Sequence, residues 1–178
     1  MSADPAARAT PLVVVVTGPP ASGKTTVAER LAEALEVPLL TKDSIKERLF
    51  DELGWSDGEW SNTLGRASIL LLHDLSERLV AARVPHVVEA NFEALSTERL
   101  AALHARLVQV YCSAPPDVLI RRFEERPRHP GHVDDTWNLA DELDKGRWPR
   151  LELDAPTIEY ETETGAPDEV VVRVLALR

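Results

Sequence analysis

The segment spanning residues 18–25 constrains the fold of this chain more strongly than any other stretch. Its sequence, GPPASGKT, follows a short apolar run at residues 12–17 and leads into residues 27–35, where apolar side chains recur at helical spacing. A strand, a glycine-rich turn and a helix in this order and spacing are typical of the phosphate-binding P-loop. The glycines let backbone N–H groups curl around a phosphate, and the positive end of the helix dipole adds to the attraction. The segment therefore predicts a binding site for a nucleoside triphosphate.

Two side chains within this segment have separate expected tasks. Lys24 supplies a mobile positive charge for the β- and γ-phosphate oxygens, and the hydroxyl of Thr25 can ligate Mg²⁺. The predicted cofactors are therefore ATP and Mg²⁺. The residues expected to surround the phosphates are Gly18, Pro19, Pro20, Ala21, Ser22, Gly23, Lys24, Thr25 and Thr26.

The composition is that of an ordinary globular domain. The 178 residues are 44% hydrophobic and 28% charged, and we expect a flexible tail at residues 1–11 followed by one domain at residues 12–178. The net charge of −10 disfavours binding to nucleic acids and to anionic membranes. No apolar run is long enough to span a membrane, and the single cysteine, Cys112, cannot form an internal disulfide, so we expect a cytoplasmic protein.

Strand-like and helix-like segments alternate along the chain. The expected strands cover residues 12–17, 37–40, 86–90, 107–111 and 157–160. The first expected helix ends near residue 36, and the others cover residues 44–53, 64–82, 96–104, 115–123, 134–145 and 167–177. Residues 54–61 are expected to form a loop. Ser44 and Glu47 match a capping box, which predicts that the second helix begins at Asp43 or Ser44.

This alternation predicts an α/β fold of the P-loop NTPase type. A five-stranded parallel sheet is expected to carry helices on both faces, giving three α/β/α layers. Ligands of such sheets bind beyond the carboxyl ends of the strands. The P-loop, Asp43, Glu89 and Asn91 are all expected at that edge.

The P-loop, followed by a strand and the sequence Lys42-Asp43-Ser44-Ile45-Lys46, resembles a family of small P-loop kinases. This AAA-type ATP-binding family includes chloramphenicol phosphotransferase, the 5′-kinase of polynucleotide kinase, seryl-tRNA kinase and zeta toxins. The resemblance covers about residues 12–132. It implies that Asp43 is the general base that accepts the proton of a substrate hydroxyl. The alternative role for Asp43 is a helix N-cap, which is common for aspartate.

Three further residues at this edge are candidate contacts. Lys46 follows Asp43 by about one helical turn and could contact an anionic group of the substrate, or it could be a solvated helix lysine. The resemblance implies that Glu89 lies near Mg²⁺ and contacts it through water, since glutamate is longer than the aspartate of many relatives. Asn91 is expected to position substrate or phosphate. The alternative for Glu89 and Asn91 is an ordinary turn at the end of a strand.

Residues 121–132 are rich in arginine and are interrupted by Pro127, Pro130 and Gly131. The segment resembles the lid of small kinases, expected at about residues 124–135, which closes over ATP. Guanidinium groups that reach the phosphates only on closure would stabilise a transition state whose charge is spread over the transferring group. Arg122 and Arg126 are the first candidates for catalysis and nucleotide binding, and Arg128 is the next, for substrate binding. The alternative is a solvated, charged helix face.

The residues together favour an ATP- and Mg²⁺-dependent kinase that phosphorylates a hydroxyl of a small molecule. Asp43, Lys24, Arg122 and Arg126 would be its catalytic residues. One alternative is a polynucleotide or nucleotide-linked 5′-hydroxyl kinase, which the seven acidic residues and the absence of Lys or Arg in residues 151–169 disfavour. Another is a non-catalytic nucleotide-dependent switch, which would need neither a base nor a lid. The acceptor and the oligomeric state are not predicted.

Overall fold

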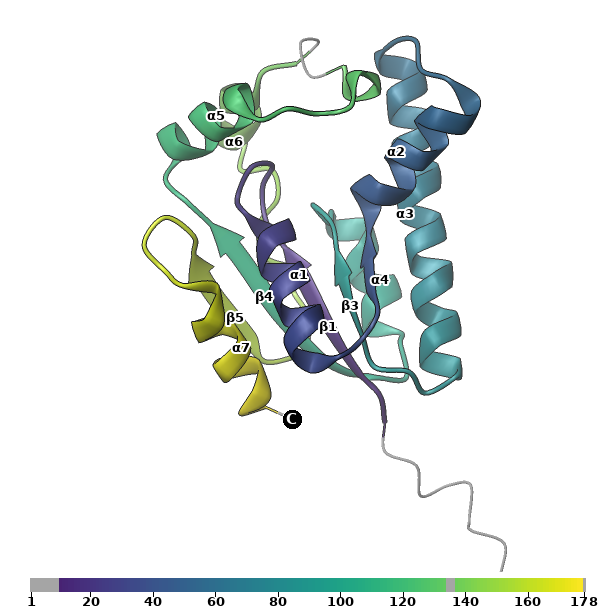
Figure 1. The fold of residues 1–178 in the computed structure, drawn as a ribbon, viewed down its shortest axis with the longest axis vertical. Helices are drawn as coiled ribbons and strands as arrows, with labels where there is room; N and C mark the ends of the chain where they lie inside the picture. Colours follow the sequence, from purple (N-terminus) through teal and green to yellow (C-terminus); the bar gives the residue numbers. More distant parts are fainter. Residues whose placement is uncertain (1–9, 134–136, 178) are drawn as a thin grey trace, which may run out of the picture.

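The structure is a computed structural model that describes residues 10–133 and 137–177, and Figure 1 shows its layers. The strands are β1 (Leu12–Thr17), β2 (Leu39–Thr41), β3 (His86–Glu89), β4 (Arg106–Ser113) and β5 (Thr157–Glu161). The helices are α1 (Lys24–Leu35), α2 (Lys42–Leu53), α3 (Gly58–Ala81), α4 (Ala94–Ala101), α5 (Pro116–Glu125), α6 (Leu139–Asp144) and α7 (Pro167–Leu175), with a short 3₁₀ helix, η2 (Pro130–His132).

The five strands form one parallel sheet in the order β2-β3-β1-β4-β5. This confirms the predicted α/β fold. The first strand along the chain, β1, lies in the centre, and all six of its residues are buried. Because the carboxyl ends of parallel strands share one edge, the residues that follow β1, β2 and β3 lie at that edge. The sheet thereby places the P-loop between the segments that follow its neighbours.

Alternate residues of β1 face two separate cores, as the pleat of a strand requires. Val14 and Val16 pack in one core with residues of α1 and α7, whereas Val13 and Val15 pack in the other with residues of α3 and α4. Helices therefore cover both faces of the sheet, which confirms the three-layer arrangement (Figure 1). In the described part of the chain, no helix combines the length and the apolar character needed to cross a bilayer.

Two helix starts differ from the expectation. α2 begins at Lys42, because the hydroxyl of Thr41 accepts a hydrogen bond from the backbone N–H of Ser44 at 3.3 Å and caps the helix. The capping box at Ser44 is therefore wrong, and Asp43 lies in the first turn rather than at the cap. α3 begins at Gly58, since a carboxylate oxygen of Asp57 accepts from the backbone N–H of Trp60 at 2.9 Å. Half of the expected loop at residues 54–61 is thus helical.

Two predicted segments lie partly outside the described residues. The first is the expected tail, of which residues 1–9 are not described. Its last residue, Pro11, is held at the sheet, because its carbonyl accepts a hydrogen bond from the backbone N–H of Arg106 at 2.9 Å. Residues 134–136, which include the end of the expected lid, also lie outside the description. Of the described residues in the expected helix at 134–145, residues 139–144 form α6.

The segment after α5 crosses the carboxyl edge of the sheet and reaches α2 and α3 through η2 (Figure 1). Gly131 and His132 are buried there. A Cβ atom on Gly131 would lie 2.7 Å from the ring of Phe50, so the backbone of the turn rests directly on that ring. His129 stacks on the same ring with 5.2 Å between centroids. The arginine segment is therefore seated on α2 through its turn.

Candidate active site

The P-loop has a backbone that only particular residues can adopt. Gly18 has a φ of +147°, and a side chain there would overlap the carbonyl oxygen of Cys112 on β4. Gly23 has a φ of +75° and immediately precedes α1. No side chain caps the first turn of α1, a turn lying wholly within the described residues. N–H groups without a capping side chain at a helix start, next to a glycine-rich turn, are suited to binding phosphate.

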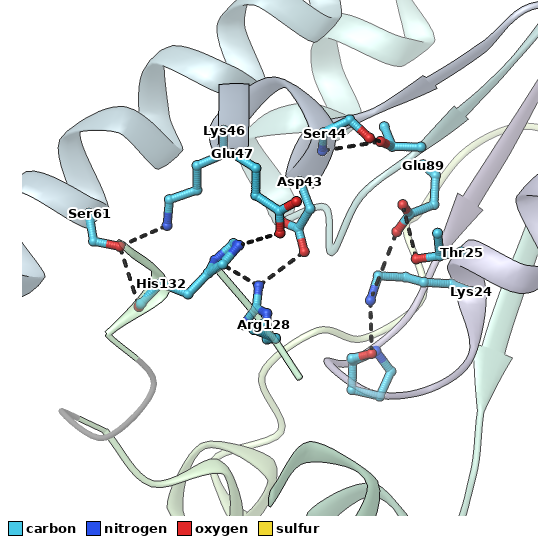
Figure 2. A network of polar contacts seen from close by, with 12 residues as sticks. Lys24, Thr25, Asp43, Ser44, Lys46, Glu47, Ser61, Glu89, Arg128 and His132 are labelled. Atoms are coloured by element: carbon cyan, nitrogen blue, oxygen red, sulfur yellow. Dashed lines mark hydrogen bonds and ion pairs between the residues drawn. The ribbon is translucent and has the colours of Figure 1, made fainter. Parts of the chain in front are cut away.

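Lys24, Thr25 and Glu89 meet beside this loop (Figure 2). Nζ of Lys24 donates to the carbonyl of Pro19 at 3.2 Å and lies 3.9 Å from Oε1 of Glu89. The hydroxyl of Thr25 donates to Oε2 of Glu89 at 3.4 Å. Burial lowers the pKa of Lys24 and raises the pKa of Glu89, although the attraction between the two charges opposes both shifts. A bound phosphate would compensate the buried positive charge of Lys24, and a bound cation would compensate the buried negative charge of Glu89.

The hydroxyl of Thr25 and the carboxylate of Glu89 are oxygen donors of the kind that Mg²⁺ prefers. Among the described residues, no three His, Cys, Asp or Glu side chains cluster as a metal site would require. A few protein oxygens completed by water and phosphate are the usual environment of Mg²⁺ in nucleotide enzymes. The residues present therefore fit a magnesium ion that is held partly by the nucleotide.

Asp43 lies in the first turn of α2 with its side chain 46% exposed. Oδ2 accepts a hydrogen bond from Nη2 of Arg128 at 3.1 Å. Burial by itself would raise the pKa of Asp43, but the positive charges of Lys42, Arg128 and Lys24 outweigh it and hold the pKa at about 2. Asp43 is therefore ionised at neutral pH, and its field reaches the lysine of the P-loop. Because Thr41 caps α2, the role of Asp43 as an N-cap is excluded.

Arg122 at the end of α5 and two arginines of the segment after it point to three different places. Nη1 of Arg122 donates to the hydroxyl of Thr162 at 2.9 Å, at the end of β5. Arg126 lies over the ring of Phe123, 4.8 Å from its centroid, and its charge lowers the pKa of Lys24, so it lies towards the P-loop. Arg128 contacts Asp43. These three guanidinium groups are partly buried rather than on a solvated helix face.

An open hollow of about 410 Å³ lies under this segment. It is lined by Phe123, Glu124, Arg126, Arg128, His129, Pro130, His132 and Val133. The hollow borders the arginines that face the P-loop and Asp43. It offers room for a small ligand with polar groups.

Lys46 is buried, which excludes the alternative of a solvated helix lysine. Its Nζ donates to the hydroxyl of Ser61 at 2.9 Å and lies 5.2 Å from the centroid of the Phe50 ring. Asn91 lies two residues beyond β3 and is partly buried at the same edge as Glu89. Its role, like that of Lys46 towards a substrate, stays a prediction.

The sequence did not indicate the contacts that Glu47 and His132 make in this site. Glu47 appeared only as a capping partner, yet its Oε1 accepts a hydrogen bond from Nε2 of His132 at 3.0 Å. Nδ1 of His132 in turn accepts from Nη2 of Arg128 at 2.7 Å. Glu47 and His132 lie 85 residues apart in the sequence, so no local spacing could have indicated their contact.

A protein-family model described as an AAA domain matches residues 13–140. The chain belongs to this family of P-loop kinases. The kinase is 31% identical to a shikimate kinase of Corynebacterium efficiens over 166 residues, which cover 92% of this chain and 94% of that protein. It is 35% identical to a cytidylate kinase of Ignicoccus hospitalis over 115 residues, which cover 64% of each chain. A crystal structure of a kinase candidate from Chloroflexus aurantiacus is similar with a TM-score of 0.87 and 38% identity, covering 94% of this chain and 98% of that one.

Proposed function

We propose that this P-loop kinase transfers the γ-phosphoryl group of ATP, with Mg²⁺, to a hydroxyl of a small molecule, and that Asp43 is the general base. The observation that carries the proposal is the position of Asp43. Its ionised carboxylate lies in the first turn after β2, close enough to Lys24 for each charge to shift the pKa of the other. A hydroxyl bound at Asp43 would face a phosphate bound at the P-loop, as in-line transfer needs.

Each neighbouring group has a task in this reaction. Lys24 and the first turn of α1 would hold the β- and γ-phosphates, and Thr25 and Glu89 would hold Mg²⁺, Glu89 through water. The ion, when bound, neutralises charge that develops on the phosphate oxygens. Arg126 would approach the transferring group from the other side. In this way the positive groups surround the site where negative charge spreads in the transition state.

The low pKa of Asp43 is compatible with this role. In a loose transition state the bond to the acceptor oxygen is only slightly formed, so the hydroxyl keeps its proton until late. A carboxylate that orients the hydroxyl and takes its proton at the end of the step need not be a strong base. This role requires that Asp43 keep its position and its negative charge. The ion pair with Arg128, at 3.1 Å, favours both.

The kinase relatives named above act on different acceptors, and their chemistry supplies a test. A hydroxyl acceptor needs a base, whereas a phosphate acceptor is already an anion and does not. Hydroxylated acids, sugars, phenicol-like compounds and nucleoside monophosphates would be screened for acceptor-dependent release of ADP. For the best hydroxyl acceptor, Asp43→Asn is expected to lower kcat by about 10²–10⁴-fold while leaving the affinity for ATP unchanged.

Asp117→Asn is the matched control, because Asp117 also lies in the first turn of a helix, α5. The control makes the same change of charge near a helix start without touching Asp43. We expect it to retain the wild-type rate. An Asp43→Asn variant that phosphorylates a hydroxyl as fast as the wild type would refute the assignment of the base. Turnover of nucleoside monophosphates alone would refute the proposed acceptor class.

A further inference from the structure

A closed chain of polar contacts joins the arginine segment to α2 (Figure 2). Glu47 accepts from Nε2 of His132 at 3.0 Å, His132 accepts through Nδ1 from Arg128 at 2.7 Å, and Arg128 donates to Asp43 at 3.1 Å. Asp43 and Glu47 are one helical turn apart on α2, while Arg128 and His132 lie on the segment that crosses the sheet. The chain therefore begins and ends on the helix that carries the proposed base.

The chemistry of these groups allows one protonation state of His132. A guanidinium group can only donate hydrogen bonds, so the Nδ1 atom that faces Arg128 must carry a lone pair. The single proton of the neutral ring is then on Nε2, where the carboxylate of Glu47 accepts it. Burial, together with the charge of Arg128, lowers the pKa of His132 to about 3 and keeps the ring neutral. Glu47 thus selects the tautomer that Arg128 requires.

Packing holds the imidazole in this position. The ring of His132 packs against that of Phe50 in a T-shaped contact with 5.5 Å between centroids, and its side chain is 4% exposed. The hydroxyl of Ser61 on α3 lies 3.4 Å from the backbone carbonyl of His132 and donates to it. The close contact of Gly131 with Phe50 fixes the preceding residue. Both the ring and the backbone of His132 are therefore restrained from three sides.

We propose that Glu47 and His132 are positioning residues for phosphoryl transfer, because they hold Arg128 against one oxygen of Asp43. This inference rests on the proposed role of Asp43. The hydrogen bond from Arg128 to Oδ2 restrains the orientation of the carboxylate. Oδ1 of Asp43 has no partner among the described residues and is left to receive the acceptor hydroxyl. The pair Glu47–His132 acts through Arg128 and touches neither the hydroxyl nor the nucleotide.

A merely structural role for Glu47 makes a different prediction for Asp43. If Glu47 only anchored the turn, its removal would take a negative charge away from Asp43, and the pKa of Asp43 would fall or stay constant. If Glu47 positions Arg128, its removal lets His132 adopt the other tautomer, which presents a proton to the guanidinium and repels it. The pKa of Asp43 would then rise towards the ordinary value of about 3.9. The sign of the shift separates the two roles.

The first experiment measures this shift directly in the ligand-free protein. Selective ¹³C labelling of the aspartate carboxyl carbons, with the signal of Asp43 assigned from Asp43→Asn, follows its ionisation by NMR. In the wild type the signal should stay that of a carboxylate down to pH 3. Glu47→Ala should raise the pKa by about one unit, since loss of a close opposite charge has an effect of this size. The other charged groups that face Asp43, namely Lys42, Lys24 and Glu89, are unchanged in these variants.

Glu52→Ala is the matched control, because Glu52 lies on the same helix and pairs with Arg48 at 2.6 Å, away from this chain of contacts. It should leave the signal of Asp43 unchanged. His132→Asn is the conservative variant, since its Oδ1 replaces Nδ1 as an acceptor for Arg128, and it should preserve the low pKa better than His132→Ala. A fall in the pKa of Asp43 in Glu47→Ala, or equal values in the two His132 variants, would overturn the proposal.

Kinetics with the best acceptor gives an independent readout. Glu47→Ala and His132→Ala should lower kcat by about 10- to 100-fold with little change in the KM for ATP, as loss of a positioning partner does. A kcat for Glu47→Ala equal to that of Glu52→Ala would refute the positioning role. Asp43→Asn, measured in parallel, distinguishes the two proposals: if it keeps the wild-type rate, the proposed base is wrong, whereas if it alone is impaired, only the role of Glu47 and His132 fails.

Discussion

Gly131→Ala tests whether the arginine segment is fixed on α2 by its turn. The added Cβ would lie 2.7 Å from Cγ and Cδ2 of Phe50 and 2.8 Å from Cδ1. Carbon atoms in contact prefer about 3.5–4.0 Å, so the turn and the ring must separate by roughly 1 Å. The ring cannot easily withdraw, because Phe50 is 1% exposed and is covered by His129 and Lys46. The turn must therefore move.

Overpacking of this kind lowers the free energy of unfolding by about 1–3 kcal/mol. In a domain of this size each 1 kcal/mol lowers Tm by about 2–4 °C, which predicts a decrease of about 2–12 °C. Displacement of the turn would also carry His132 away from Arg128. We therefore expect kcat to fall together with the stability, and by more than the loss of stability alone would cause at 25 °C.

Urea unfolding of Gly131→Ala in the wild-type and Phe50→Leu backgrounds isolates the contact. The smaller, more adaptable leucine should relieve the overlap, so the cost of the alanine should shrink by at least half in the second background. Residues in direct contact show such coupling, whereas independent sites add within about 0.5 kcal/mol. A Gly131→Ala variant as stable as the wild type, or an equal cost in both backgrounds, would refute the tight seating of this turn.

Three further predictions concern charged groups. Mg-ATP at 100 times its Kd should raise the free energy of unfolding of the wild type by about 2.7 kcal/mol and thereby raise its Tm. Lys24→Ala should abolish most of this rise in Tm, and equal melting shifts would argue against the P-loop assignment. Arg126→Ala should lower kcat more than it raises the KM for ATP, and steady-state kinetics with unchanged kcat would reduce Arg126 to a surface charge. The pKa of His132 is about 3 in the folded protein and about 6.5 in the unfolded chain. Between these values the unfolded chain binds a proton that the folded protein does not, so the free energy of unfolding falls as the pH drops. At pH 5 the loss relative to pH 7 is on the order of 1–2 kcal/mol. Urea unfolding at pH 7 and pH 5 should show a smaller loss in His132→Asn than in the wild type, and equal losses would contradict this role of His132.

Local patterns were sufficient to predict the sheet and the position of the P-loop within it. The strand at residues 12–17 and the P-loop are encoded by adjacent residues, and the alternation of strands and helices leaves few topologies for a parallel sheet. The start of α2 was missed because Thr41 and Ser44 are both good caps. The structure uses Thr41, which directly ends β2, so the chain enters the helix as soon as the strand stops.

The second half of the site depends on contacts that are distant in sequence. Pro127, Pro130 and Gly131 indicate a break in the helix, but the same residues serve a mobile loop and a closely packed turn equally well. Gly131 is needed here for the approach to Phe50, which lies 81 residues earlier in the chain. Glu47 and His132 carry no motif, and each is an ordinary surface or loop residue until the fold brings them together.

The contact between Gly18 and β4 also affects when the P-loop can fold during synthesis of the chain. The P-loop sequence leaves the ribosome before β4, but the backbone at Gly18 rests against the carbonyl of Cys112, and β1 pairs with β4 along its whole length. A nascent chain that ends before β4 has the complete phosphate-binding sequence without the strand that supports it. We therefore expect nucleotide to stabilise the growing chain only after β4 has emerged, so that earlier folding rests on the apolar packing of β1 and α1.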